Sequence, residues 1–296
     1  MRTSRYILII LVVFVIIILW FFMPVPPSDI KGSLYSRAYL TGMVRVPRLW
    51  GSPFPEIISS LPGKPISLPS IPFFIKPFLP PAAEIYIFGS KEGGGRAVAI
   101  DLGWRSRLFR ILHGFIIGQI QYRGFGAAEG ENIIRTPSGL KLLVYQDAGT
   151  LFLAEGEELI GKILKPDLDK GKGLVPGVNM EQDIAYISFS NNEMEFANVI
   201  EGLEKDIGFL LLPSAGSLKD GIIELRYAKG ETLSAEISLG VRGGGNTEDI
   251  EGDIGYLIDI LDRFLSTKNF KTEKTINKET GKIIVEVIIH PTGGTK

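Results

Sequence analysis

The sequence predicts an α+β fold, in which a single N-terminal transmembrane helix precedes two antiparallel-sheet units with helices packed on one face. Three observations carry this prediction: residues 6–23 are almost wholly apolar, several later stretches alternate apolar and polar residues between glycine-rich turns, and others repeat apolar residues at helical spacing. Alternation is typical of half-buried strands, and a period of three to four residues is typical of amphipathic helices. Tight turns between short strands favour antiparallel pairing, because parallel strands need long crossovers.

The apolar stretch begins at Tyr6, ends at Met23 and contains no charged residue. A helix of this length, at about 1.5 Å per residue, spans roughly 27 Å, close to the hydrocarbon thickness of a bilayer. The stretch is longer than the apolar region of a cleaved signal peptide, and no pair of small residues follows it as a cleavage site would require. We therefore expect residues 6–23 to form an uncleaved signal anchor.

The residues around this anchor predict its orientation. Arg2 and Arg5 precede it, so the positive-inside rule keeps residues 1–5 in the cytoplasm as a short tail. The rest of the chain is then extracytoplasmic, and we expect a single-pass protein of the inner (cytoplasmic) membrane of a bacterial-type envelope. The expected partners are the membrane and an envelope protein or anionic envelope component.

Composition excludes several classes of function. The chain has 32 Lys and Arg against 33 Asp and Glu, so no excess of cations is present to neutralise nucleic-acid phosphates. It has no cysteine, which excludes disulfides, thiol chemistry and thiolate metal sites. We expect no nucleic-acid partner and no cofactor, and a fold that depends on its apolar core.

Residues 24–82 are predicted to form a proline-rich stem that sets the distance between the anchor and the first unit. Residues 53–81 contain half of the 18 prolines, which oppose regular helix and favour extended, semi-rigid backbone. Short helical character is expected earlier, at residues 34–43. The stem also carries Phe73, Phe74 and Phe78, which would leave an apolar patch if they were exposed. Two interpretations remain open: the stem packs along the first unit, or it touches the membrane surface or a partner.

The two predicted units span residues 83–168 and 178–290. In the first, strands are expected at residues 85–89, 96–101, 115–124, 132–136, 140–147 and 150–155, with helices at 103–114 and 157–164. In the second, strands are expected at residues 183–190, 221–228, 232–241, 269–277 and 282–290. One helix of this unit is capped by Asn191 or Asn192, and a second starts at Asn246 or Thr247 with acidic residues in its first turn.

Three near-motifs for catalysis fail on inspection. Residues 156–163 have the frame of a phosphate-binding loop, but Ile163 replaces the Ser or Thr that would bind magnesium. Ser138 begins an S-x-x-K sequence, yet prolines and glycines place it in a turn and the matching K-T-G motif is absent. The two histidines, His113 and His290, stand alone and cannot build a histidine-rich zinc site. No catalytic residue and no metal ligand is therefore assigned.

The candidate binding residues are of two kinds. Phe73, Phe74 and Phe78 belong to the stem, and a set of arginines makes the helix at 103–114 basic. These arginines are Arg105, Arg107 and Arg110. They form either an ordinary solvated helix surface or a contact for anionic lipid or wall polymer.

The sequence therefore predicts a membrane-anchored, extracytoplasmic binding or scaffold protein without catalytic activity. The alternatives are an envelope hydrolase with an unrecognised active site, or a lipid carrier with an apolar cavity. A hydrolase requires carboxylates, or a serine and a histidine, that converge in a cleft.

Overall fold

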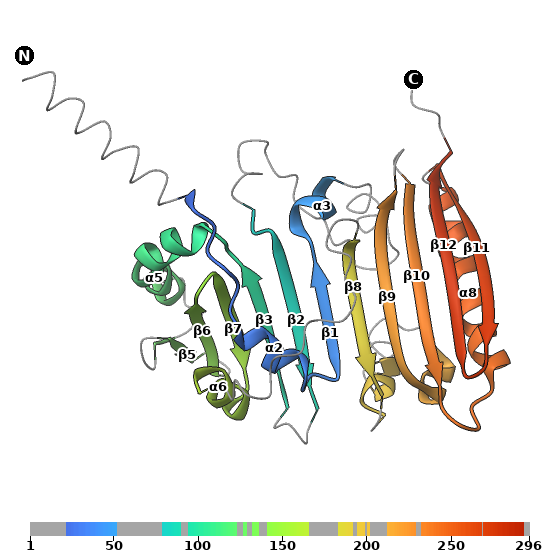
Figure 1. The fold of residues 1–296 in the computed structure, drawn as a ribbon, viewed down its shortest axis with the longest axis horizontal. Coiled ribbons are helices and arrows are strands. Elements are labelled where there is room, and N and C mark those ends of the chain that lie inside the picture. The colour runs from blue at the N-terminus through green and yellow to red at the C-terminus, as the bar shows by residue number, and fades with distance from the viewer. Residues whose placement is uncertain are drawn as a thin grey trace, which may run out of the picture.

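A computed structural model of the chain describes residues 22–51, 79–89, 94–122, 127–128, 132–135, 141–165, 183–191, 194–198, 200–201, 212–228, 232–267 and 269–292. The strands among them form one continuous antiparallel sheet, in the order β11-β12-β10-β9-β8-β1-β2-β3-β7-β6-β5-β4 (Figure 1). The general α+β prediction, a mostly antiparallel sheet with helices, is confirmed.

The strand bounds are β1 Leu40–Val44, β2 Ala82–Phe88, β3 Gly95–Asp101, β4 Ala127–Ala128, β5 Ile133–Arg135, β6 Lys141–Asp147, β7 Thr150–Glu155, β8 Asp183–Ser190, β9 Leu218–Ala228, β10 Thr232–Val241, β11 Phe270–Glu279 and β12 Lys282–Pro291. The helices are α2 Ile30–Tyr35, α3 Val46–Gly51, α5 Arg105–Tyr122, α6 Glu157–Leu164 and α8 Thr247–Ser266, with a short 3-10 helix, η4, at Pro213–Ser217.

Strand β1 joins the two halves of the sheet. Its residue Thr41 lies opposite Tyr86 of β2 on one side and opposite Ser188 of β8 on the other. The prediction of helical character at residues 34–43 is therefore wrong, since α2 ends at Tyr35 and a strand follows. The central residues of β1 are buried on both faces, which removes the alternation that identifies a half-buried strand.

The pairing of β1 with β2 also contradicts the role predicted for the proline-rich segment. The range assigned to the stem contains α2, β1 and α3, while residues 52–78 lie outside the described part of the chain. The proline-rich segment lies between β1 and β2, which pair with each other. Its two ends are held by neighbouring strands, so it cannot set the distance between an anchor and the first unit.

Helices cover both faces of the sheet, which corrects the prediction of a single covered face. We call the face that carries Tyr86 and Ser188 the front face and the opposite one the back face; α2 lies in front of the sheet and α8 behind it in Figure 1. Two consecutive residues of β6 show that both faces of the sheet are covered. Leu143 packs in the front core with α2 and α6, while Val144 packs in the back core near Phe109 of α5. Helix α8 covers the back of the second half.

Most other elements agree with the sequence analysis. The 140–147 and 150–155 stretches form the hairpin β6–β7, and Ala148 in its turn has a φ of 47°. The expected hairpins β9–β10 and β11–β12 are also present. One strand prediction is wrong: residues 115–122 continue helix α5. The apolar run after Gly114 fits either a strand or a helix, so its spacing alone cannot decide between them.

Among the described residues, none of the helices is both long and apolar enough to cross a membrane. The predicted anchor lies almost entirely outside the described residues, which begin at Phe22.

Candidate functional site

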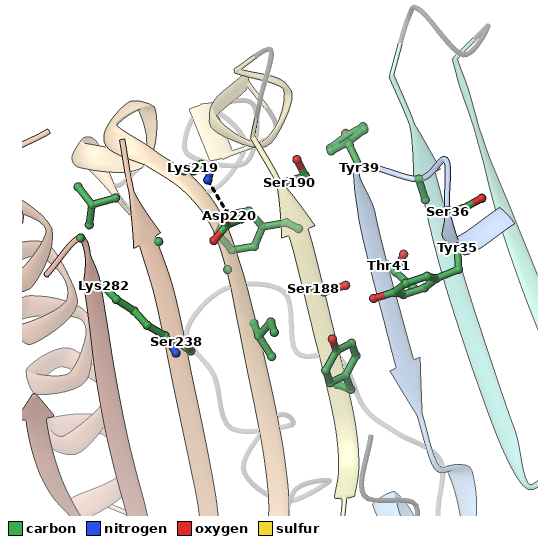
Figure 2. Close-up of a pocket in the computed structure, with 18 residues that line it drawn as sticks. Tyr35, Ser36, Tyr39, Thr41, Ser188, Ser190, Lys219, Asp220, Ser238 and Lys282 are labelled. Atoms are coloured by element: carbon green, nitrogen blue, oxygen red, sulfur yellow. Dashed lines mark ion pairs between the residues drawn. The ribbon is translucent and has the colours of Figure 1, made fainter. Parts of the chain in front are cut away.

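A groove of about 670 Å³ opens on the front face of the second half, beside the end of α2. Strands β1, β8, β9 and β10 supply most of its floor, and the start of β12 closes one end. Hydroxyl side chains dominate its polar lining: Tyr35, Ser36, Tyr39, Thr41, Tyr186, Ser188, Ser190 and Ser238. Figure 2 shows Thr41, Ser188 and Ser238 on the strands of the floor and Tyr35 and Tyr39 at one side, with Lys219, Asp220 and Lys282 on the opposite side from the tyrosines. The volume is typical of ligand-binding clefts.

Cross-strand register brings these residues together. Thr41 lies opposite Ser188, Ser188 opposite Ile222, and Ile222 opposite Ser238, so four adjacent strands contribute one row of side chains. Residues that lie directly opposite each other in antiparallel strands point to the same face. Most of these side chains are small, which keeps the floor of the groove low.

A second row contains the charged groups. Ser190, Asp220, Gly240 and Lys282 lie opposite one another across β8, β9, β10 and β12. The Asp220 carboxylate lies above Gly240, where an added Cβ would come within 2.3 Å of its Oδ1 atom. Asp220 also faces the ammonium group of Lys219 at 4.0 Å. Asp220 is the sole carboxylate among the described lining residues, against two lysines.

The hydroxyl of Tyr186 stays protonated at neutral pH. Burial raises the pKa of Tyr186 to about 12, with a further contribution from the hydrogen-bonded Tyr35 hydroxyl. Burial and the nearby Glu195 carboxylate likewise raise the pKa of Tyr39. Both tyrosines therefore offer the groove neutral hydroxyls that donate and accept hydrogen bonds.

A polar cluster fixes α2 as the wall of this groove. The Lys31 ammonium group lies 2.5 Å from Glu84 Oε1 and 2.8 Å from Asp101 Oδ2, and the Tyr86 hydroxyl donates to the other oxygen of Glu84. Burial alone would lower the pKa of Lys31, but the carboxylates of Glu84 and Asp101 outweigh it and raise that pKa. A lysine held in its charged form is a poor nucleophile, so this cluster is structural.

The chain before α2 is fastened in the same way. The Ser28 hydroxyl donates to Asp147 Oδ2 at 2.5 Å, and its backbone N–H donates to Thr150 Oγ1 at 3.0 Å. The Gly149 N–H donates to the Pro26 carbonyl at 2.8 Å, and a side chain at Gly149 would collide with that carbonyl. Residues 24–29 therefore lie along the sheet as a docked segment.

The groove offers little for hydrolysis. A carboxylate mechanism needs two acidic groups, and the described lining residues supply Asp220 alone. The described part of the chain also holds no group of three or more His, Asp or Glu side chains arranged for a metal ion. His290 faces Thr232 and Glu273, and His113 lines a separate small pocket with Arg110. The described lining residues offer hydrogen bonding and charge attraction.

A second hollow is wholly apolar in character. A cavity of about 260 Å³ lies between the back of the sheet and α8, and its lining includes Phe196, Ile237, Ile258 and Val287. An engineered apolar cavity of about 150 Å³ stays dry and binds benzene, so a hollow of this size has room for an apolar ligand.

The predicted arginines all lie on α5, remote from the groove lining. Arg105 donates to the Leu102 carbonyl at 3.4 Å and stacks on Trp104 at 4.8 Å from the ring centroid. Arg107 donates to the Met23 carbonyl at 2.8 Å, and Arg110 is exposed. The predicted stem residues Phe73, Phe74 and Phe78 lie outside the described residues.

The near-motifs have structural roles where they are described. Gly156 precedes α6 with a φ of 103°, and Glu158 pairs with Lys162 one turn later in the helix. Asn191 is a helix cap, as expected: its Oδ1 accepts hydrogen bonds from the N–H groups of Phe196 and Ala197. Ser138 lies outside the described residues.

Sequence reasoning missed the groove, although one signal for it exists. Ser188 and Ser190 of β8, and Ser238 of β10, occupy alternate positions beside buried residues such as Phe189 and Leu239. Small hydroxyl residues on the exposed face of two strands leave a hollow only if the strands are close. That condition depends on register, which alternation within one strand does not reveal.

No protein-family model matches the chain, and no curated protein matches it. Two crystal structures of TP0453 share distant similarity with it. Crystal form III aligns at 13% identity with a TM-score of 0.47, covering 90% of this chain and 95% of that one. Crystal form I aligns at 14% identity with a TM-score of 0.46, covering 88% and 92%. Likeness at this level supports no assignment of function.

Proposed function

We propose that this protein is a membrane-anchored, extracytoplasmic binding protein of a bacterial-type envelope, and that its groove binds a wall glycan carrying carboxylates. Residues 6–23 serve as the transmembrane signal anchor, and the two antiparallel units form one binding platform. The single observation that carries the proposal is the hydroxyl-lined groove across four adjacent strands. Serine, threonine and tyrosine hydroxyls can both donate to and accept from sugar hydroxyls.

The shape of the groove favours an extended polymer over a small molecule. Neighbouring strands lie about 4.8 Å apart, so a ligand crossing four strands has a path of roughly 15–20 Å. The charges at one end favour acidic groups on that polymer, since Lys219 and Lys282 outnumber Asp220. In such a polymer, the neutral sugar rings would lie along the row of hydroxyls and a carboxylate would lie at the two lysines.

The position of the groove fits a protein held at a membrane. Helix α5 follows the end of β3, and β3 runs in the same direction as β1 because both are antiparallel to β2. The groove lies beside Tyr39 and Thr41 at the start of β1, and therefore at the opposite end of the strands from α5. The docked chain at Met23 lies next to α5. A membrane at that end leaves the groove open toward the wall.

The test is co-sedimentation of the purified full-length protein with insoluble peptidoglycan. Ser238→Trp fills the floor of the groove and should weaken binding roughly tenfold, the loss expected for about 1.4 kcal/mol of contacts. Ser234→Trp is the matched control: it lies on the same strand and face, two positions further along that face, and does not line the groove. Thermal unfolding of both variants checks that each retains the fold. Equal binding by the two variants, or no binding by the unmodified protein, rejects the proposal.

A lipid carrier is the second candidate, because the back-face cavity is lined by apolar side chains. It predicts that native mass spectrometry of protein purified from membranes detects a co-purified lipid. Ile258→Trp fills the cavity from α8 and should abolish that signal while peptidoglycan binding persists. A ligand-free mass for the unmodified protein would remove this candidate.

A further inference from the structure

Helix α5 turns an apolar side away from the protein. Ser106 and Phe109 lie on its inner side, the first buried and the second packed against the back core. On the outer side, Ile111 is 74% exposed and Phe115 is 66% exposed, with Leu112 beside them. Residues four apart share one side of a helix, so these three form a continuous outer stripe of α5. Exposed apolar patches of this kind usually mark a contact surface.

The outer stripe adjoins the end of the predicted anchor. The rings of Phe22 and Trp104 lie 4.8 Å apart between centroids, and Trp104 immediately precedes α5. Arg107 donates a hydrogen bond to the Met23 carbonyl at 2.8 Å. Phe22 and Met23 are themselves 54% and 58% exposed, so the apolar surface continues from the chain at the anchor onto the helix.

The charged residues of α5 itself are all arginines. Arg107 and Arg110 flank the stripe, and α5 contains no acidic residue. An apolar helix side bordered by arginines is the pattern of helices that lie in the interface of a bilayer, where the apolar side enters the acyl boundary and the cations meet anionic headgroups. Each such cation strengthens the attraction to an anionic surface.

We propose that α5 lies on an anionic membrane surface, with Ile111, Leu112 and Phe115 inserted below the headgroups. The inference rests on the proposed anchor, which would hold Phe22 at the bilayer and bring the adjoining stripe to it. The membrane is favoured over a second copy or another protein for that reason, since any anchored molecule places this patch at lipid. The contact would fix the tilt of the whole sheet and keep the groove facing the wall.

The test uses full-length protein in vesicles of phosphatidylcholine and phosphatidylglycerol. Because the chain has no cysteine, single cysteines can carry an environment-sensitive fluorophore at chosen positions. Labels on Phe115→Cys, Val13→Cys and Tyr256→Cys report the stripe, the anchor and an exposed site on α8, and spin-labelled lipids serve as quenchers. We expect quenching at residue 115 by spin labels near the headgroups, quenching at residue 13 and none at residue 256. Arg110→Gln, which removes one cation, should reduce the lipid-contacting population of the residue 115 label about fivefold.

The outcomes separate the two proposals. Quenching at residue 13 without quenching at residue 115 overturns the role of α5 and leaves the anchor intact. A residue 115 label that is shielded from water yet unquenched by lipid also overturns it, because a protein then covers the stripe. Absence of quenching at residue 13 rejects the anchor, and quenching at residue 115 in that case supports α5 alone.

Discussion

The ammonium group of Lys31 lies 2.5 Å from the carboxylate of Glu84, and this ion pair ties α2 to strand β2. Asp101 of β3 completes the cluster from the next strand. Because Tyr35 of α2 and the adjoining Ser36 line the groove, the cluster holds one wall of the binding site against the sheet, and α2 also packs in the front core.

Removing the charge of Lys31 should destabilise the protein strongly. Lys31→Met leaves two carboxylates without their cation in a largely buried position, which typically costs about 3–5 kcal/mol. The measurement is the free energy of unfolding from urea denaturation. The double variant Lys31→Met with Glu84→Gln should recover part of the loss, because one of the two unpaired charges is gone. A loss below about 1 kcal/mol for the single variant would contradict a stabilising role for the cluster.

The stability of the protein should fall at alkaline pH. The pKa values of Lys31, Tyr86 and Tyr186 are all raised in the folded state, so each group binds its proton more tightly there than in the unfolded chain. Their contribution to the free energy of unfolding is complete at pH values below their ordinary pKa values of 10 to 10.5. It is lost as the pH rises from there through the raised pKa values of the folded state. The free energy of unfolding should therefore decline above about pH 10.

Tyr186→Phe isolates one part of this pH dependence. Between pH 10 and pH 12 its stability should decline less steeply than that of the unmodified protein, because the buried hydroxyl no longer titrates. The matched control is Tyr256→Phe, which removes a hydroxyl from the exposed surface of α8. Identical slopes for all three proteins would disprove the role of Tyr186.

Asn191 should contribute more stability than an ordinary helix cap. Its amide donates to the carbonyls of Ala215 and Leu218 at 3.0 Å each, while its Oδ1 caps the helical turn at residue 196. Asn191→Ala removes the acceptor of the Phe196 and Ala197 N–H groups and one of the donors to each of the two carbonyls, a cost of about 2 kcal/mol or more. Asn246→Ala removes an exposed cap on α8 and should cost only about 1 kcal/mol. Comparable losses in urea denaturation would show that the buried network adds nothing.

The sequence predicted the elements whose signals are local. The acidic first turn and apolar stripe of α8 identified that helix, and Ile250, Ile254 and Ile258 are buried as expected. Strand β1 escaped prediction because it is buried on both faces and lies between strands from distant parts of the chain. The front-face core also depends on α2, whose six residues are too short for a clear apolar period.

The candidate site was less predictable for the same physical reason. In the helix predicted at residues 103–114, the spacing of the apolar residues indicates one apolar side, but it cannot tell whether that side faces the sheet or the solvent. Likewise, the groove arises from the pairing of Thr41 with Ser188 and of Ile222 with Ser238. Such contacts are determined by register between strands, and a single sequence shows only the residues within each strand.

The most direct test of the central claim is the side of the membrane on which the groove lies. Single cysteines can be placed at Ser238 in the groove and at Ser4 before the predicted anchor, since the chain has no other cysteine to label. Spheroplasts of cells producing each full-length variant are treated with a membrane-impermeant maleimide before and after lysis. We predict that Ser238→Cys is labelled in intact spheroplasts and that Ser4→Cys is labelled only after lysis. Labelling of Ser4→Cys but not Ser238→Cys before lysis would contradict the account, because the groove would then face the cytoplasm.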